Sequence, residues 1–475
     1  MKILVLNPPG PYCRAGSRWP HKRASNGLKY NPFPFFIAYA TSTLLKAGYE
    51  ADIKDCIALE WDRRELLNYT SSFNPDLIVM ETSAPSYYYD IETLKRLKVR
   101  GRKIVAVGSH ASATSKEHIR DGFDYVIIGE YEISLLKLVQ HLDGKVKRMP
   151  RSVYHKKNQR VSYSKLIDDL DSLPWPPWNL MPMKAYNDPF CFGKNVAVMS
   201  SRGCIHNCSF CTIALFYGRP GCRLRDPVKV CDEISYLVEK YKPDDIYFED
   251  DSITIFKKHI IAMCKEYKKR KFGVPFSCMG DCAVDNKTLK IMAEAGCRAF
   301  KFGVESFDPK VLKMIPKHIT IKDVKRVVKR CKELGIKTHP TFVLGLPGET
   351  LESARNTVNE AFKLDTDTLQ FSTATPYPGT RLYKMAEENG WLSKKGWKFF
   401  DGSGEVVISY PEFTSKEIMD IYKNAWVRWE RRLVFKKPGT LYQHLYGKYR
   451  REGAIPTLRM IISGTKKLVK GEKIG

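Results

Sequence analysis

The sequence has no long apolar run, and this limits where the protein can reside. No stretch approaches the roughly 18 consecutive apolar residues that a membrane-spanning helix requires. The opening Met-Lys-Ile-Leu-Val-Leu-Asn-Pro-Pro is too short for the apolar region of a signal peptide and predicts a first β-strand instead. We therefore expect a cytoplasmic protein in which most of the 13 cysteines stay reduced.

Acidic residues are scarce relative to basic ones. The chain holds 52 Asp and Glu against 79 Lys and Arg, which gives a formal net charge of +27. This charge favours anionic partners without choosing among nucleic acid, an acidic lipid surface and phosphorylated substrates. The apolar content of 43% is ordinary for a globular protein, and 475 residues suffice for two or three domains.

The cysteines lack the pattern of a zinc ribbon or a disulfide framework, yet three of them lie close together. Cys204, Cys208 and Cys211 form a C-x3-C-x2-C run after an apolar segment, with Phe210 before the last cysteine. No second pair appears at ribbon spacing, and three cysteines cannot all pair with one another. Three thiolates on so short a loop can hold three irons of a 4Fe–4S cluster and leave the fourth iron open.

This run resembles the cluster motif of the radical S-adenosylmethionine (SAM) superfamily. The resemblance implies that the open iron binds the amino and carboxylate groups of SAM. It also implies that an electron from the cluster cleaves SAM to methionine and a 5′-deoxyadenosyl radical. An external electron donor, such as flavodoxin or ferredoxin with its reductase, and a small-molecule or lipid substrate would complete the reaction.

Residues 1–145 alternate short apolar runs with helical patterns. This alternation predicts a doubly wound parallel sheet of the α/β class, in which ligands bind beyond the carboxyl ends of the strands. The expected strands are residues 3–6, 51–55, 76–80, 103–107 and 124–128, and the expected helices are residues 35–46, 91–98, 115–120 and 133–142.

The turns after these strands resemble the cobalamin-binding domain that precedes the barrel in many radical SAM enzymes. The Asp-x-His-x-x-Gly loop that ligates cobalt in the best-known cobalamin proteins is missing, and Asp55-Cys-Ile-Ala-Leu-Glu60 stands in its place. Two interpretations stay open: cobalamin held without a histidine on its lower face, or a domain that kept the fold and lost the cofactor. A histidine on such a turn is also often only a polar surface residue. The resemblance implies cobalamin contacts from Pro8, Ser83, Gly108, His110, Gly129 and Glu130.

Residues 146–195 predict a connector, because their proline-rich segment 168–178 suits neither a regular helix nor a regular strand. The alternation resumes over residues 196–390 and predicts a partial (β/α)6 barrel, whose chemistry gathers at the carboxyl ends of the strands. The expected strands are residues 196–200, 245–249, 275–279, 299–304, 338–344 and 368–373.

Three of these strand ends resemble SAM-binding turns of the superfamily. Carboxylates after the second strand suit the ammonium of SAM, and polar atoms after the fourth suit the ribose hydroxyls. Glycines after the fifth let the backbone approach the adenine. Each turn is also compatible with an ordinary structural role, since acids suit a helix N-terminus. The resemblance implies SAM contacts from Glu249, Asp250, Asp251, Glu305, Ser306, Gly345, Pro347 and Gly348.

Residues 391–475 leave the barrel pattern and predict a small helical region. Thr414 and Glu417 have the spacing of a capping box, so we expect a helix over residues 415–432. From Arg428 onward the chain has 13 Lys or Arg against 3 Glu and no Asp. This composition is typical of a helix on the inner, anionic face of a membrane, and equally of a basic solvated tail. Nucleic acid is disfavoured because no RNA-binding module is recognisable.

Two reactions remain open from the sequence. The first is cobalamin-dependent methylation of an unactivated carbon. The second is radical ring formation, carbon–carbon joining or rearrangement on a membrane lipid or isoprenoid-type substrate, without methyl transfer. The opening Asn-Pro-Pro and the basic loop around residues 16–20 resemble members that act on hopanoid or archaeal membrane lipids. No residue is assigned a catalytic role from the sequence.

Overall fold

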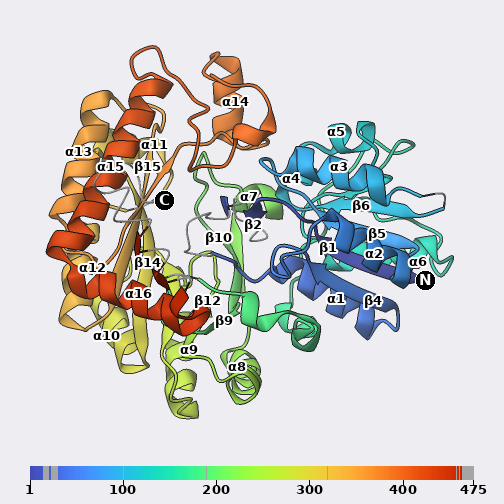
Figure 1. The fold of residues 1–475 in the computed structure, drawn as a ribbon, viewed down its shortest axis with the longest axis horizontal. Helices are drawn as coiled ribbons and strands as arrows, with labels where there is room; N and C mark the ends of the chain where they lie inside the picture. The colour runs from blue at the N-terminus through green and yellow to red at the C-terminus, as the bar shows by residue number, and fades with distance from the viewer. Residues whose placement is uncertain are drawn as a thin grey trace.

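Two α/β lobes lie side by side in the computed structural model of the protein, with a hairpin between them (Figure 1). The structure describes residues 1–13, 21–22, 30–99, 101–188, 190–317, 319–455, 457–458 and 461–462. The basic loop around residues 16–20 therefore lies outside the described residues.

The N-terminal lobe contains a six-stranded sheet in the order β4-β1-β5-β6-β7-β8. Its first five strands are parallel, as the sequence predicts, while β8 pairs antiparallel with β7. β8 lies beyond residue 145, so the start of the predicted connector completes this sheet. The strands are β1 (Lys2–Asn7), β4 (Glu50–Asp55), β5 (Leu77–Glu81), β6 (Lys103–Val107), β7 (Tyr125–Ile127) and β8 (Val153–Tyr154), beside a short pair β2 (Tyr12–Cys13) and β3 (His21–Lys22).

Both faces of this sheet are buried, which makes it doubly wound. Ile3 and Val5 belong to the core shared with α1 and α6, whereas Leu4 and Leu6 belong to a second core shared with α2 and α3. Alternate strand residues point to opposite faces, so one strand serves both cores. The helices are α1 (Phe35–Lys46), α2 (Arg63–Phe73), α3 (Tyr87–Leu97), α4 (Ser109–Ala113), α5 (Ser115–Arg120) and α6 (Glu132–Leu142).

The second lobe is the predicted half-barrel. Its six strands are parallel in the order β16-β15-β14-β13-β12-β9, and the helices cover the outer face (Figure 1). The strands are β9 (Asn195–Val198), β12 (Asp245–Phe248), β13 (Phe276–Gly280), β14 (Cys297–Glu305), β15 (Lys337–Leu344) and β16 (Gln370–Thr373), and the helices are α8 (Pro227–Tyr241), α9 (Lys257–Arg270), α10 (Asn286–Glu294), α11 (Pro309–Met314), α12 (Ile321–Glu333) and α13 (Leu351–Lys363).

A hairpin follows the first barrel strand and was not expected from the sequence. Strand β10 (Ser201–Cys204) pairs antiparallel with β11 (Gly221–Leu224), and the short helix α7 (Ile213–Tyr217) lies in the loop between them. Gly203 has a φ of +95°, and a Cβ atom there would lie 2.2 Å from the carbonyl oxygen of Gly221. Only glycine lets the two strands approach this closely.

The connector and the C-terminal region pack onto this frame. Connector residue Trp178 is buried, with its ring centroid 4.6 Å from that of Phe33. The predicted capping box of α15 is present at Thr414 and Glu417, and this helix packs against β16 and α13. The connector contains the 3-10 turns η1 (Leu170–Ser172), η2 (Trp178–Leu180) and η3 (Met183–Ala185). After the barrel come α14 (Arg381–Glu388), the 3-10 turn η4 (Trp397–Phe399), α15 (Ser415–Lys436) and α16 (Pro438–Glu452).

Candidate functional site

The three motif cysteines sit at the end of the hairpin strand β10. Cys204 is its last residue, and the backbone N–H of Cys211 donates to the carbonyl of Cys208 at 3.2 Å, which closes the turn. All three are free thiols of intermediate exposure. Burial raises the pKa of Cys204 to about 11 and that of Cys208 to about 12, so these thiols must lose protons when iron binds.

The three thiols suit a cluster better than a single ion. Cys208 and Cys204 both add to the effect of burial in raising the pKa of Cys211, so the three groups are mutual neighbours. No three His, Cys, Asp or Glu side chains converge on a single-ion site within the described ranges. In an iron–sulfur cluster each cysteine binds a different iron, so convergence on one point is not needed.

Two of the three carboxylates that follow β12 hold the cysteine hairpin. Asp250 accepts hydrogen bonds from the backbone N–H of Ser200 at 3.1 Å and from its hydroxyl at 2.8 Å. Asp251 accepts from the N–H of Gly203 at 2.9 Å. Burial raises the pKa of Asp250 to about 6. Both carboxylates thus orient the hairpin, and their binding of the SAM ammonium stays a prediction.

Polar and charged side chains from the cysteine loop, from the ends of β13 and β14 and from the residues after α11 lie near the thiols. The Nε2 of His206 lies 2.7 Å from Asp281 Oδ2, and Lys317 Nζ donates to Glu305 Oε1 at 2.8 Å. The positive charge of Lys317 partly offsets the rise in the pKa of Cys208 that burial causes. Of these four, the sequence singled out only Glu305. Asp281 follows β13 directly, so the strand-end rule could have found it.

The remaining predicted SAM residues have structural contacts. The buried Ser306 hydroxyl lies 3.1 Å from Thr357 Oγ1 and accepts from the N–H of Asp308 at 3.0 Å. Gly345 has a φ of +87°, and a Cβ atom there would lie 3.0 Å from Ile418 Cδ1 on α15. The neighbouring Pro347 is buried, and Gly348, with a φ of +78°, is exposed. Adenine and ribose contacts from these residues stay predictions.

Four of the predicted cobalamin residues lie together at the edge of the N-terminal sheet that carries the carboxyl ends of its strands. Gly108 has a φ of +104°, and a Cβ atom there would lie 3.2 Å from the carbonyl oxygen of Thr82. At Gly129, whose φ is +83°, a Cβ atom would lie 3.0 Å from the Tyr163 ring. The four residues are Pro8 after β1, Ser83 after β5, Gly108 after β6 and Gly129 after β7.

His110 provides the test of whether a cofactor fits this edge. Its ring is 4% exposed and lies among the rings of Tyr87, His118 and Trp397, at 5.1–5.4 Å between centroids. Neither ring nitrogen has a hydrogen-bond partner among the residues that the structure describes. Burial lowers the pKa of His110 well below its usual value, so the ring is neutral. A buried neutral imidazole without partners fits a polar group bound beside it.

Glu130, the sixth predicted cobalamin residue, also joins the two lobes. Arg202 Nη1, on β10, donates to Glu130 at 2.8 Å and to Glu132 at 2.7 Å, and Arg223 Nη1, on β11, donates to Glu130 at 2.7 Å. The side chains of Arg202 and both glutamates are at most 3% exposed. Burial opposes ionisation of Glu130, but the two arginines hold its pKa below the usual value. We call these four residues the seam network.

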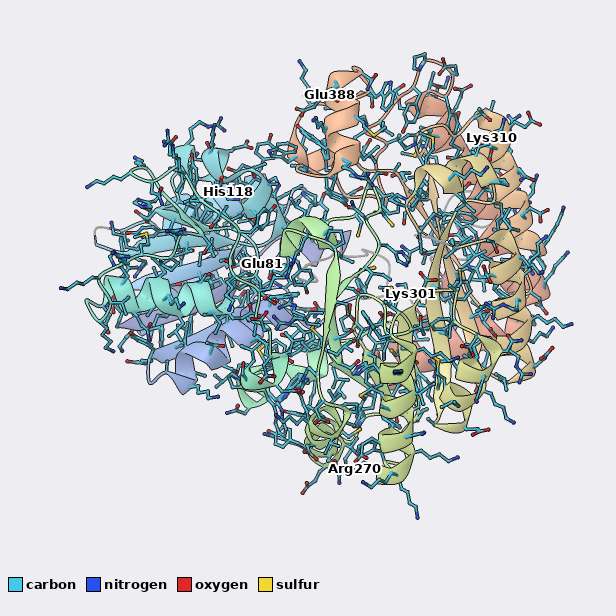
Figure 2. All side chains as sticks on the ribbon, turned by 180° about the vertical axis from the view of Figure 1, so that it is seen from behind. Glu81, His118, Arg270, Lys301, Lys310 and Glu388 are labelled. Atoms are coloured by element: carbon cyan, nitrogen blue, oxygen red, sulfur yellow. The ribbon has the colours of Figure 1, made fainter. Side chains whose placement is uncertain are left out.

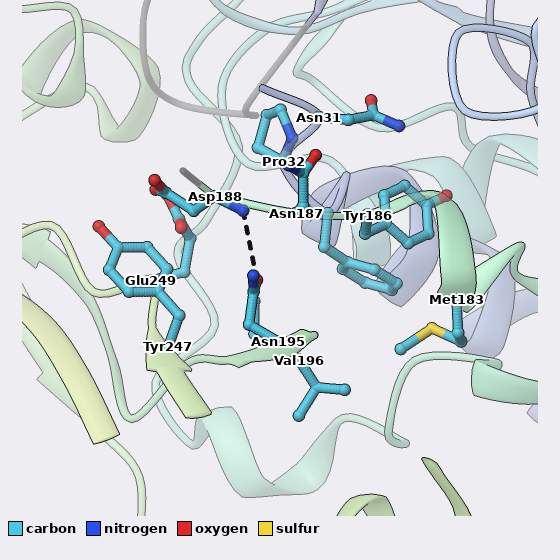
Figure 3. A pocket seen from close by; sticks show the side chains of 12 residues that line it. Asn31, Pro32, Met183, Tyr186, Asn187, Asp188, Asn195, Val196, Tyr247 and Glu249 are labelled. Carbon is cyan, nitrogen blue, oxygen red and sulfur yellow. Dashed lines mark hydrogen bonds between the residues drawn. The ribbon is translucent and has the colours of Figure 1, made fainter. Parts of the chain in front are cut away.

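A pocket lies where the N-terminal lobe, the connector and the barrel meet (Figure 3). Asn31 comes from the segment before α1, Tyr186 and Asp188 come from the connector, and Tyr247 and Glu249 come from β12 and the residue after it. Glu249 therefore lines this pocket, directly before the two carboxylates that hold the hairpin, and its contact with SAM stays a prediction.

Comparison with known proteins agrees with the cluster-binding site that the geometry indicates. The profile described as the Radical SAM superfamily matches residues 198–361. An uncharacterized methyltransferase of Pyrococcus horikoshii is 31% identical over 405 residues, which cover 83% of this chain and 87% of that protein. The anaerobic magnesium-protoporphyrin IX monomethyl ester cyclase of Rubrivivax gelatinosus is 28% identical over 368 residues, which cover 74% of this chain and 66% of that protein.

A solved structure shares the fold of both lobes. The radical S-adenosylmethionine methyltransferase TsrM from Kitasatospora setae, solved with cobalamin and a [4Fe-4S] cluster bound, superposes with a TM-score of 0.66 at 18% identity. The match covers 83% of this chain and 76% of that one. The cysteine hairpin follows the first barrel strand, and these relatives match most of the chain. The chain therefore belongs to the radical SAM superfamily of enzymes.

Proposed function

We propose that the protein cleaves SAM reductively and uses cobalamin to methylate an unactivated carbon of a small-molecule substrate. The observation that carries this proposal is the C-x3-C-x2-C hairpin, which presents Cys204, Cys208 and Cys211 between the barrel and the N-terminal lobe. When bound, the cluster would supply the electron that cleaves SAM, and cobalamin would supply the methyl group. An external one-electron donor such as flavodoxin or ferredoxin would reduce the enzyme.

The residues of the chain have separate tasks in this proposal. Asp250 and Asp251 fix the hairpin, so that the thiols keep their orientation toward the strand ends. Glu249 lines the pocket and Glu305 lies beside the thiols, where each would bind polar groups of SAM. Lys317 Nζ donates to Glu305 Oε1 and holds this carboxylate in place.

Cobalamin would lie against the carboxyl edge of the N-terminal sheet, which faces the hairpin. Pro8, Ser83, Gly108 and Gly129 mark this edge, and the buried nitrogens of His110 are available to a polar group of the cofactor. Glu130 would act at a distance from the cofactor, because its oxygens bind Arg202 and Arg223.

A second reaction is favoured by one relative. The cyclase of Rubrivivax gelatinosus closes a ring, according to its name, and shares most of its length with this chain. In that alternative the radical drives ring formation, carbon–carbon joining or rearrangement, and the N-terminal lobe positions the substrate.

Anaerobic reconstitution with iron, sulfide and hydroxocobalamin separates these proposals. Four irons and one cobalt per chain, with S-adenosylhomocysteine formed from SAM, support methylation. Four irons without cobalt, with 5′-deoxyadenosine as the product of SAM, support the alternative. The triple change Cys204→Ala, Cys208→Ala and Cys211→Ala should remove the iron, whereas Cys222→Ala, on the partner strand of the same hairpin, should retain it. Iron that survives the triple change contradicts both.

We also propose that the C-terminal region contacts an anionic membrane surface. The exposed apolar side chains of this region include Phe435 (77% exposed) at the end of α15 and Tyr442 (65%) on α16, within the segment that carries 13 basic and 3 acidic residues. Apolar and basic side chains together are what binding at an anionic lipid interface requires. No helix in the described parts of the chain is both long and apolar enough to cross a bilayer, so this contact would be peripheral.

A further inference from the structure

The concave face of the barrel sheet carries an unusual lysine. On β14, Phe300 and Phe302 are fully buried against the helices, and Lys301 between them has intermediate exposure. Successive strand residues point to opposite faces, so Lys301 points to the concave side, away from the helices. Figure 2 labels Lys301 on the side of the sheet that faces the centre of the molecule.

The neighbours of Lys301 on this face are polar. In the parallel register Lys301 lies beside His339 of β15, whose Nδ1 lies 2.8 Å from Thr368 Oγ1. On the next strand, Gln370 Nε2 donates to Ser372 Oγ at 3.2 Å, and both residues have intermediate exposure. Barrel interiors are usually filled by bulky apolar side chains, so this polar, partly open surface is not built for packing alone.

The charge of Lys301 is not neutralised by a neighbour. Across the part of the chain that the structure describes, Lys301 forms no ion pair, while three acids at the ends of strands in the same sheet already pair with other side chains. Glu305 binds Lys317, Asp281 binds His206 and Asp245 binds Arg298. A cation on a partly buried surface without a carboxylate partner favours an anionic ligand.

The position of Lys301 separates it from the predicted SAM residues. It precedes Glu305 by four residues on the same strand, which corresponds to about 13 Å at the rise of a β-strand. A group bound at Lys301 would therefore lie deeper in the barrel than the strand ends. The rest of the bound ligand would extend from there toward the cysteine hairpin.

We infer that Lys301, with His339 beside it, forms a substrate subsite for an anionic group, a carboxylate or a phosphate. The inference rests on the proposed function in one respect, namely that the half-barrel holds the substrate. It assigns a chemical class to that substrate: an elongated molecule with an anionic group at one end and the reacting carbon about a strand length away.

Residue-specific lysine acetylation tests this subsite without turnover. The full-length reconstituted enzyme is treated with a limiting N-hydroxysuccinimide ester of acetate, and acetylation at each lysine is measured by peptide mass spectrometry. Pyrophosphate and succinate serve as probes, against chloride at the same ionic strength. We expect at least one probe to slow acetylation of Lys301 about fivefold, and the more protective probe identifies phosphate or carboxylate. The exposed Lys310 on α11, labelled in Figure 2, should be unaffected and is the internal control.

Three outcomes overturn the inference. In the first, neither probe protects Lys301. In the second, Lys301 and Lys310 are protected equally. In the third, SAM protects Lys301 while pyrophosphate and succinate do not, and this result would assign Lys301 to the SAM site. Equilibrium dialysis adds a second measurement: Lys301→Met should weaken binding of the protective probe about tenfold, whereas Lys310→Met should not, and equal affinities contradict the inference. Iron content and SAM cleavage are measured separately, so failure of the proposed function is distinguished from failure of the subsite.

Discussion

At the scale of single residues, Glu349 is a buried acid that retains its proton near neutral pH. It is 4% exposed, its Oε2 accepts from the N–H of Gly345 at 2.5 Å, and burial raises its pKa to about 8. In the unfolded chain a glutamate titrates near about 4.3. Between these values the folded state binds a proton that the unfolded state has released, so stability falls as the pH rises.

Glu349→Gln should therefore flatten the pH dependence of stability. For the wild type, we expect this group to lower the free energy of unfolding by about 1.4 kcal/mol for each pH unit between roughly pH 5 and pH 8. Thermal unfolding of wild type and variant across this range measures the difference. The exposed Glu352→Gln on α13 is the control and should keep the wild-type slope. Identical slopes for wild type and Glu349→Gln contradict the prediction.

At the scale of elements, the hairpin β10–β11 depends on the seam network. Arg202 is 2% exposed, and its guanidinium carbon also lies 4.8 Å from the ring centroid of Phe36 on α1. Arg202→Met leaves Glu130 and Glu132 buried with only Arg223 as a cation nearby. Removing one partner of a buried ion pair costs about 3–5 kcal/mol, so Tm should fall by several degrees.

Calorimetry on Arg202→Met and on a matched surface variant checks this expectation. Arg120→Met removes an arginine that pairs with Asp121 at the surface, and its Tm should stay close to that of the wild type. Equal Tm changes for the two variants would show that the seam network has no special role.

The regular elements were predictable from the sequence, whereas the hairpin was not. Periodicity defines long helices such as α1, whose observed bounds Phe35–Lys46 match the prediction, and buried strands such as β6 (Lys103–Val107). The helix α2 was missed although Asp62 and Glu65 form a capping box that marks its start. β10 was missed because its four residues, Ser-Arg-Gly-Cys, carry no apolar strand pattern, and because its partner β11 is distant in sequence.

The candidate site, like the fold, was only partly predictable from the sequence. The rule that chemistry gathers at the carboxyl ends of strands gave the cysteines, the carboxylates after β12 and Glu305. Lys317 and Arg202 were not found, because their roles depend on which turns face one another across the barrel and across the seam. The sequence alone does not give the order of the strands in the sheet, and without that order it does not show which turns are neighbours.

At the scale of the whole molecule, the C-terminal region that the membrane proposal uses carries a net charge of +10 from Arg428 onward, out of +27 for the chain. We expect the full-length protein to float with vesicles that contain phosphatidylserine and not with vesicles of phosphatidylcholine alone. Salt at about 0.5 M should release it, because the attraction is partly electrostatic.

Changing Phe435 and Tyr442 to serine together tests the apolar part of this contact. We expect flotation to decrease severalfold, whereas Tyr88→Ser, which changes an exposed tyrosine of the N-terminal lobe, should have no effect. Flotation that does not depend on anionic lipid would argue against the proposal, and so would flotation that survives the double change.

The seam network also constrains how these two lobes can be combined with others. Two buried glutamates belong to the N-terminal lobe and the arginines that neutralise them belong to the cysteine hairpin of the barrel. A chimera that joins this N-terminal lobe to a barrel without these arginines would bury carboxylates without a cation and lose stability. The lobe and the hairpin are therefore compatible only as a matched pair, and the unit that can be exchanged between enzymes is larger than either domain.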